Sequence, residues 1–190
     1  MNSEKKTVKS ILIAGVLVMG LGLLSKVQAA GNPDTMTISV TPSVSYAVTI
    51  TSVNPSGYQF GTVALAASTI STWAIGVRNT GTIWEYFSMA VGNSSPDAWT
   101  PGAAGTAANN VFGLIGEFNA TQPADASFVG GDALTGSIPG AAAALYGQAS
   151  TKTAVNGTKN LWLKLNMPTS LSVGTGGAQT MVVSINGQAS

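Results

Sequence analysis

The feature that most constrains this chain is the alternation of apolar and polar residues over short runs. The clearest run, residues 161–167 (LWLKLNM), places its leucines and Met167 on one side and Trp162, Lys164 and Asn166 on the other. A period of two is the pattern of a β-strand with one face in a hydrophobic core. The run therefore predicts a half-buried strand.

Similar runs recur along most of the chain, at residues 35–40, 44–50, 58–65, 71–77, 86–91, 111–118 and 179–185. Segments rich in Gly, Pro, Asn and Ser separate them, as expected for turns. Pro42, between the first two runs, indicates a break or a sheet edge. Many short strands without a long helical pattern predict an all-β fold, an antiparallel β-sandwich of about eight strands, either Ig-like or jelly-roll-like.

The alternation weakens between residues 119 and 157, where Gly, Ala and Ser dominate. No charge run and no proline-rich spacer accompanies this stretch, so it is predicted to be a long excursion from the sandwich rather than a linker. No internal repeat is visible. We therefore expect one β-sandwich domain over residues 30–190.

Residues 1–29 are typical of a secretory signal peptide. Lys5, Lys6 and Lys9 form a positive segment, residues 11–24 are apolar, and residues 27–29 (VQA) fit a cleavage site for small residues. A retained membrane anchor is the alternative, but fourteen apolar residues are few against the roughly 20 that span a bilayer. The expected location is outside the cell or at its surface, with periplasmic retention also open, and no integral membrane segment in the mature chain.

The chain has no His and no Cys, and only 8% of its residues are charged. Catalysis through a Ser–His or Cys–His pair is therefore excluded, as is a zinc site of the usual kind. Residues 30–190 keep four cations, which are too few for a wide phosphate-binding surface, so nucleic acid is not an expected partner. No cofactor is expected, and a weak calcium site made of scattered oxygen ligands stays open.

Two carboxylates are the best candidates for chemistry, because each lies in a largely apolar strand. They are Glu85 and Glu117. A paired-carboxylate mechanism would need the two groups within about 5 to 10 Å of each other. The alternative, which we favour, is that each is solvated or paired with a cation, and that Arg78 and Glu85 keep a strand end in water. The chain is accordingly not expected to be an enzyme.

Aromatic side chains are the remaining functional signal. Trp84, Tyr86 and Trp162 fall opposite the apolar faces of their strands, and Trp99 lies in a Pro/Gly-rich loop. Exposed rings anchor protein interfaces and stack on sugar rings. These four residues are the candidate interaction surface. The alternative is that the excursion at 119–157 covers this face, with Trp99 closing one end of the sandwich.

One segment resembles a unit found in secreted bacterial Ig-like domains, namely a strand ending in V-x-N-T-G followed by a second short strand. Val77, Asn79 and Gly81 match its first part, and Phe87, Met89 and Val91 match the second. Asn and Gly are expected here because they tolerate positive φ where the chain reverses. The segment 58–65 (YQFGTVAL) also resembles the F-G-x-V strand that commonly precedes this unit.

A weaker resemblance is to the TasA/camelysin class of biofilm-fibre proteins, which share a cleaved signal peptide, a sandwich core and an N-T-G turn. It implies a structural protein whose N-terminal strand completes the sheet of a neighbouring subunit. Residues 31–40 would be that donor strand, with Met36, Ile38 and Val40 on its apolar face. The alternative is an ordinary first strand of the chain's own sandwich.

These observations favour a non-enzymatic secreted structural or adhesive protein of the cell surface or extracellular matrix, self-assembling through its N-terminal strand. Its expected partners are further copies of itself, in a homo-oligomer or filament, or surface glycans and proteins. The alternative is a carbohydrate-binding module that uses the exposed aromatic residues.

Overall fold

The computed structural model describes residues 38–51, 57–140, 143–174 and 177–189, so the predicted signal peptide and Met36 lie outside the described residues. Ser43–Ser190 form one compact unit, and Met1–Pro42 form another. The described part holds eight strands and three short 3-10 helices. The strands are β1 (Val48–Ile50), β2 (Ser68–Ile70), β3 (Ile75–Asn79), β4 (Tyr86–Val91), β5 (Thr100–Pro101), β6 (Val111–Phe118), β7 (Thr158–Asn166) and β8 (Val183–Gln188).

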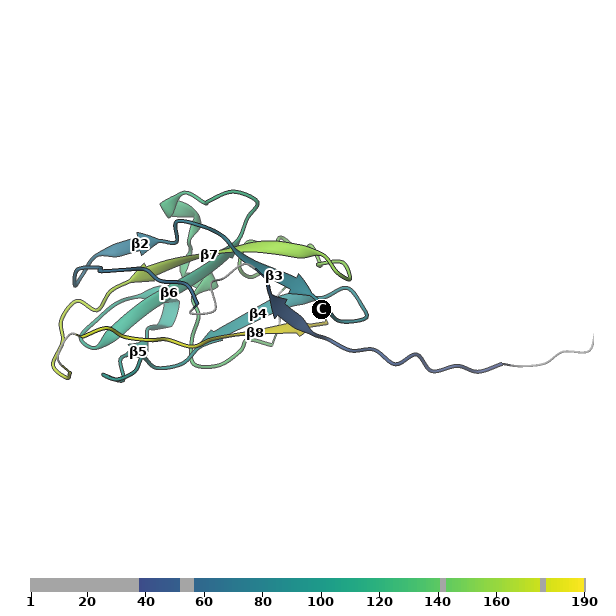
Figure 1. Cartoon of the computed structure of the whole chain (residues 1–190), viewed down its shortest axis with the longest axis horizontal. Helices are drawn as coiled ribbons and strands as arrows, with labels where there is room; N and C mark the ends of the chain where they lie inside the picture. The colour runs from purple at the N-terminus through teal and green to yellow at the C-terminus, as the bar shows by residue number, and fades with distance from the viewer. Residues whose placement is uncertain (1–37, 52–56, 141–142, 175–176, 190) are drawn as a thin grey trace, which may run out of the picture. The chain divides into compact units, whose positions relative to one another are not determined.

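Six of these strands form one sheet in the order β1-β3-β7-β6-β5, with β2 also paired to β7 (Figure 1). All pairs in it are antiparallel except the two-residue β5, which runs parallel to β6. The nine-residue β7 is its centre, since one end pairs with β3 through Ile75↔Leu161 and the other with β2. Along most of its length β7 also pairs with β6. The alternating leucines of β7 thus lie in the middle of a sheet.

The second sheet contains β4 and β8, paired antiparallel from Tyr86↔Gln188 to Val91↔Val183. Its inward residues and those of the large sheet form a common core that includes Val77, Phe87, Met89, Phe112 and Leu161. Two sheets that share one apolar layer make the fold all-β and sandwich-like, as the alternation predicts.

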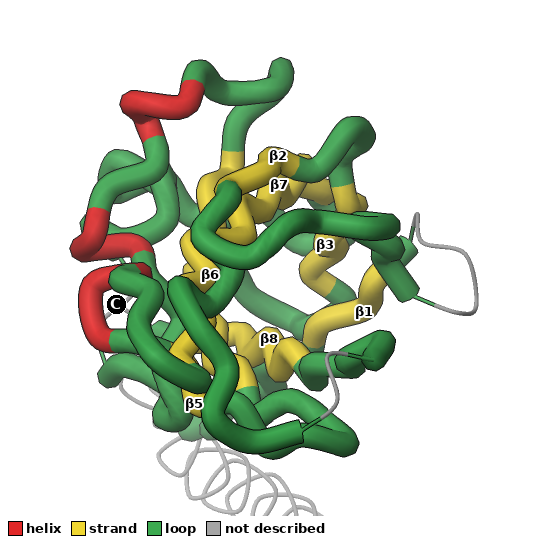
Figure 2. The backbone as a smooth tube through the Cα atoms, turned by 90° about the vertical axis from the view of Figure 1, so that its left-hand side faces the viewer, coloured by secondary structure: helices red, strands yellow, loops and turns green. Residues whose placement is uncertain are grey.

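The excursion at 119–157 covers the outer face of the large sheet. Phe128, from this segment, packs on Ile115 and Trp162. The three 3-10 helices, η1 (Ala103–Gly105), η2 (Asp125–Ser127) and η3 (Gly130–Asp132), lie along one side of the strands (Figure 2).

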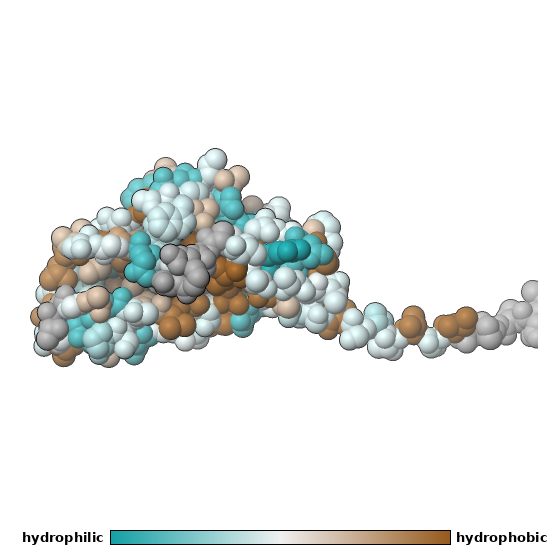
Figure 3. Space-filling view, viewed as in Figure 1, coloured by the Kyte–Doolittle hydropathy of each residue, from teal (hydrophilic) through white to brown (hydrophobic). Residues whose placement is uncertain are grey.

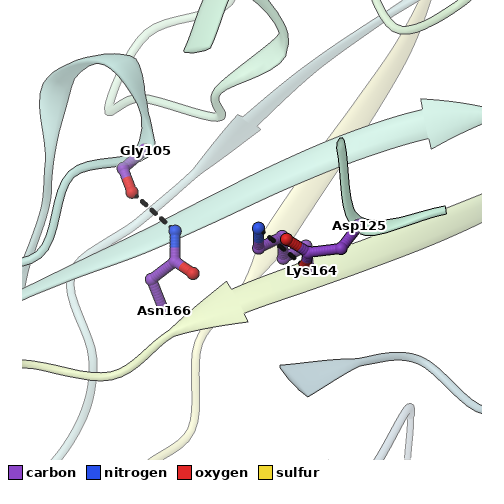
Figure 4. Close-up of polar contacts among 4 residues, drawn as sticks. All are labelled: Gly105, Asp125, Lys164 and Asn166. Atoms are coloured by element: carbon purple, nitrogen blue, oxygen red, sulfur yellow. Dashed lines mark hydrogen bonds and ion pairs between the residues drawn. The ribbon is translucent and has the colours of Figure 1, made fainter. Parts of the chain in front are cut away.

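Two polar residues of β7 hold these loops. Lys164 forms an ion pair of 2.8 Å with Asp125 of η2, and the Asn166 side-chain amide donates a 2.8 Å hydrogen bond to the Gly105 carbonyl of η1 (Figure 4). The residues of β7 that alternation places opposite the core are therefore used to hold a covering layer.

Several strand boundaries differ from those predicted. The ranges 86–91 and 111–118 are strands as predicted, whereas the described residues 38–40 and the segment 58–65 contain no strand. Strands β2 and β5 carry no alternation long enough to be recognised, because three or two residues cannot show a period. In these places the pairing partner, rather than the local pattern, determines the strand.

Candidate interaction site

Three of the four candidate aromatic residues are buried. Tyr86, Trp99 and Trp162 belong to the interior, and only Trp84 is exposed, at 60%. The prediction that Tyr86 and Trp162 face outward on their strands is correct, but the prediction that they are accessible is wrong. Four rings on four separate segments therefore do not form one exposed surface.

Tyr86 and Trp162 are buried because the excursion at 119–157 covers them, which is the alternative given in the sequence analysis. The Trp162 indole N–H donates a 3.0 Å hydrogen bond to the carbonyl of Asn119, and the Tyr86 hydroxyl donates a 2.7 Å bond to the carbonyl of Ser150. Both acceptors belong to the excursion. Trp99 instead joins the main core. Each buried ring thus anchors a loop or fills the interior.

The two candidate carboxylates are also buried, which corrects the expectation that they are solvated. Glu85 is fully buried, and desolvation raises its pKa, although the Ala47 backbone N–H partly opposes the shift. Burial likewise raises the pKa of Glu117, where Asn119 opposes the shift and the nearby Asp132 adds to it. Because both groups are shut away from solvent, neither is placed to act on a dissolved substrate.

Arg78 forms no ion pair with Glu85 or Glu117. Its guanidinium donates a 2.9 Å hydrogen bond to the Asn156 side chain at the surface. Within the described ranges, no three acidic side chains gather closely enough to hold a metal ion. The same ranges contain no helix of the length and hydrophobicity needed to cross a bilayer.

The N-T-G turn (residues 79–81) and Thr82 bind the segment that precedes β1 through backbone hydrogen bonds. The backbone N–H groups of Thr80 and Thr82 donate to the carbonyls of Ala47 and Ser45, at 2.8 and 3.0 Å. A side chain at Gly81 would bring its Cβ within 2.5 Å of the Ser45 carbonyl oxygen. Glycine is therefore required by this close approach, not by the positive φ that the sequence led us to expect, since Gly81 has none.

Residues 38–46 present apolar side chains to solvent at every second position except Pro42. The exposed fractions are 79% for Ile38, 86% for Val40, 54% for Val44 and 41% for Tyr46. Such regular exposure of large apolar groups is unusual, because it leaves a strand-like apolar face without a partner. Of the three candidate donor residues, the two that the structure describes are thus exposed.

An apolar cleft of about 860 Å³ opens between the two sheets of the Ser43–Ser190 unit. Core residues such as Leu114 and Leu163 form its floor, and Ile50, Phe60, Met181, Val183 and Ile185 line its sides. None of its lining residues is charged. Figure 3 shows apolar surface, drawn brown, in the middle of the face seen in Figure 1. The lining side chains that reach the surface include Ile50 and Leu65, which are 44% and 45% exposed.

The strand beside the cleft has a free edge. Within the described part of the chain, β8 pairs only with β4. In an antiparallel strand, successive residues direct their backbone groups to alternate sides, so about half of those in β8 face no strand. The far edge of β4 is different, because the Gln148 side chain bonds both the N–H and the carbonyl of Phe87, at 3.0 and 2.9 Å.

Sequence reasoning missed two parts of this site. Trp73, which lies in the predicted strand at 71–77, is half-exposed and lies beside Tyr58 with ring centroids 4.9 Å apart. Residues 58–65, predicted as a strand, contribute Tyr58, Phe60 and Leu65 to the wall of the cleft. Gln59, Gly61 and Thr62 of the same segment also line the cleft, so residues 58–65 form part of its wall rather than a strand of a sheet.

A scan against protein-family models and a search of curated proteins found no match to the chain.

Proposed function

We propose that the protein is a non-enzymatic, exported structural or adhesive subunit that assembles with further copies of itself through its N-terminal strand. The observation that carries this proposal is the period-two exposure of apolar side chains over residues 38–46. An extended segment with one unpartnered apolar face is the form in which peptides add to the edge of another sheet.

The composition of the segment supports the same function. Residues 35–41 (TMTISVT) carry no charge and consist of Thr, Ser and β-branched or flexible apolar residues. These residues favour strands, and the absence of charge removes the usual protection of an exposed strand against pairing. A segment of this kind is suited to association with another chain.

Carbohydrate binding is supported less well. Of the four rings considered for it, Trp84 alone presents its surface to solvent. Sugar recognition by stacking depends on exposed ring faces. Self-assembly is therefore the function that the described residues favour.

Negative-stain microscopy of the purified protein starting at Ala30, compared with a variant starting at Pro42, tests the proposal. We expect filaments or discrete oligomers from the first and monomers from the second, because only the first keeps Ile38 and Val40. A matched control keeps the full length and replaces Thr37 and Ser39, on the other face of the segment, with Ala. Monomers from all three proteins at high concentration would contradict self-assembly.

A further inference from the structure

We infer that the acceptor for the N-terminal strand is the free edge of β8 together with the apolar cleft beside it, and that the occupant is residues 35–40 of a second copy of this chain. The inference rests on the proposed function and specifies the partner surface. The incoming strand would become the third strand of the β4–β8 sheet and would place Ile38 and Val40 over the core.

The two edges of the β4–β8 sheet are protected unequally. The far edge of β4 is closed by Gln148, and the Tyr146 hydroxyl donates a further bond of 3.1 Å to the Met89 carbonyl. No described backbone group bonds the free edge of β8, although β1 lies close to part of that strand. An edge that exposes unpaired backbone groups beside an apolar surface is a template for strand addition.

Residues 35–40 match the free edge of β8 in length and the cleft beside it in polarity. Six residues of strand span roughly 20 Å, and the six residues of β8 offer an edge of the same length. The side chains that point from β8 into the cleft, Val183 and Ile185, are only half-buried. Two further apolar side chains laid beside them would complete their burial, and neither surface has a charge to desolvate.

An unpaired indole N–H in the cleft favours a peptide over a hydrocarbon chain as the occupant. Trp99 lines the cleft, is almost fully buried, and has an indole N–H without a hydrogen-bond partner among the described residues. A buried donor left unpaired destabilises the structure. A polypeptide carries carbonyl oxygens that can accept such a bond, whereas a hydrocarbon chain carries none.

The partner is a second copy because each chain presents both halves of the contact. Ile38 and Val40 are exposed, and the cleft is open, in the same molecule. A donor on one face and an acceptor on another is a heterologous contact, which joins subunits head to tail into rings or filaments. The geometry therefore implies assemblies that grow, rather than closed two-fold dimers.

Cysteine cross-linking tests this directly, because the chain contains no native cysteine. If Ile38 and Val40 enter the cleft, Ser39 must lie on the outer face, beside the outward residues Ser184 and Asn186 of β8. Ser39→Cys protein is mixed with Ser184→Cys or Asn186→Cys protein under mild oxidation. We expect a disulfide-linked dimer with one of these two positions, since opposite residues in a strand pair bring their Cβ atoms to about 5 Å.

Two controls make the result specific. Ser127→Cys, exposed on η2, measures random cross-linking with Ser39→Cys. Adding Ile38→Asp and Val40→Asp to the donor should reduce the β8 cross-link at least tenfold without altering the folded unit, whose circular dichroism spectrum is compared. Equal yields with Ser127→Cys, or no disulfide at either β8 position, would overturn the inference.

The outcomes also separate this inference from the proposed function. Filaments that depend on residues 30–41 but give no β8 cross-link would retain self-assembly and reject this acceptor. Absence of any assembly would reject both. Recovery of a stoichiometric long-chain lipid on organic extraction of the purified protein, with no cross-link, would assign the cleft to a hydrocarbon ligand instead.

Discussion

Asn79 shows how much structure one residue of this chain organises. Its side chain is fully buried and donates to the carbonyls of Ile83 and Thr153, at 2.8 and 2.9 Å. Its oxygen accepts the Gly81 backbone N–H at 2.8 Å. Asn79 thus links three parts of the chain: the end of β3, the turn that binds residues 45–47, and the end of the excursion at 119–157. This network explains the asparagine of the N-T-G turn, which does not adopt positive φ.

Asn79→Ala is expected to lower the free energy of unfolding by about 2–4 kcal/mol, because it leaves buried backbone groups without partners. Urea unfolding monitored by tryptophan fluorescence measures the change. Asn93→Ala, at an exposed position, is the matched control and should change stability by less than about 0.5 kcal/mol. Equal effects of the two substitutions would show that the hydrogen bonds of Asn79 are not important for stability.

Glu85 makes stability depend on pH. Burial raises its pKa above the ordinary value of 4.5, so the folded protein keeps a proton that the unfolded chain releases. Below that value both states are protonated and there is no effect. As the pH rises above it, ionisation favours the unfolded chain until the raised pKa is passed. Desolvation of Glu117 and Asp132 raises the pKa of each and acts in the same direction.

The free energy of unfolding is therefore expected to fall as the pH rises above about 4.5, and to fall less in Glu85→Gln, which cannot ionise. Urea titrations at several pH values in this range measure both curves. Parallel curves for the native protein and Glu85→Gln would contradict this account.

At the scale of elements, the β4–β8 sheet is protected on one side only. The Gln148 side chain offers one donor and one acceptor, the same pair of groups that a neighbouring strand would offer to Phe87. The excursion thus closes the edge of β4 with a side-chain amide. Because β8 has no such cover among the described residues, it is the edge on which a further strand can be added.

Gln148→Leu keeps the volume of the side chain but removes both bonds, so the backbone of Phe87 should lose its protection. We expect hydrogen exchange at the Phe87 amide to accelerate at least tenfold and the free energy of unfolding to fall by about 2 kcal/mol. Gln122→Leu, whose side chain bonds the carbonyl of Ser71 elsewhere, is the control and should leave exchange at Phe87 unchanged. Unchanged exchange in Gln148→Leu would show that the edge is held by other contacts.

At the scale of the whole molecule, the core of the Ser43–Ser190 unit is incomplete. A cleft of about 860 Å³ reaches core residues, and large apolar side chains at its sides remain half-exposed. Exposed apolar surface of this kind marks an interaction site more often than it occurs by chance. The same chain carries exposed apolar residues in an uncharged segment, so the proposed donor and acceptor are complementary in polarity.

A synthetic peptide of residues 31–42 should therefore stabilise a protein that begins at Ser43. A ligand present at a hundred times its dissociation constant adds about 2.7 kcal/mol to the free energy of unfolding. Thermal unfolding with increasing peptide measures the effect as a rise in the midpoint temperature. A peptide with Asp in place of Ile38 and Val40 is the control, and an equal response to both peptides would contradict specific insertion.

The sequence by itself determined the fold class and the longest strands. Alternation over residues 86–91 and 111–118 predicts β4 and β6 residue for residue, because a strand with one face in a core must repeat every two positions. The same pattern identifies the core side of β7. Local periodicity reports which side of a strand is apolar, and this property belongs to the segment alone.

Only the tertiary structure decided which of those sides is covered. Trp162 and Trp84 look alike in the sequence, yet the excursion buries the first and leaves the second exposed. Glu85 reads as a solvated charge and lies fully buried, while the apolar residues 38–46 remain exposed. Burial depends on what segments distant in the sequence place over a side chain, and the free edge of β8 likewise depends on which strands pair. Neither property is written in the local pattern of residues.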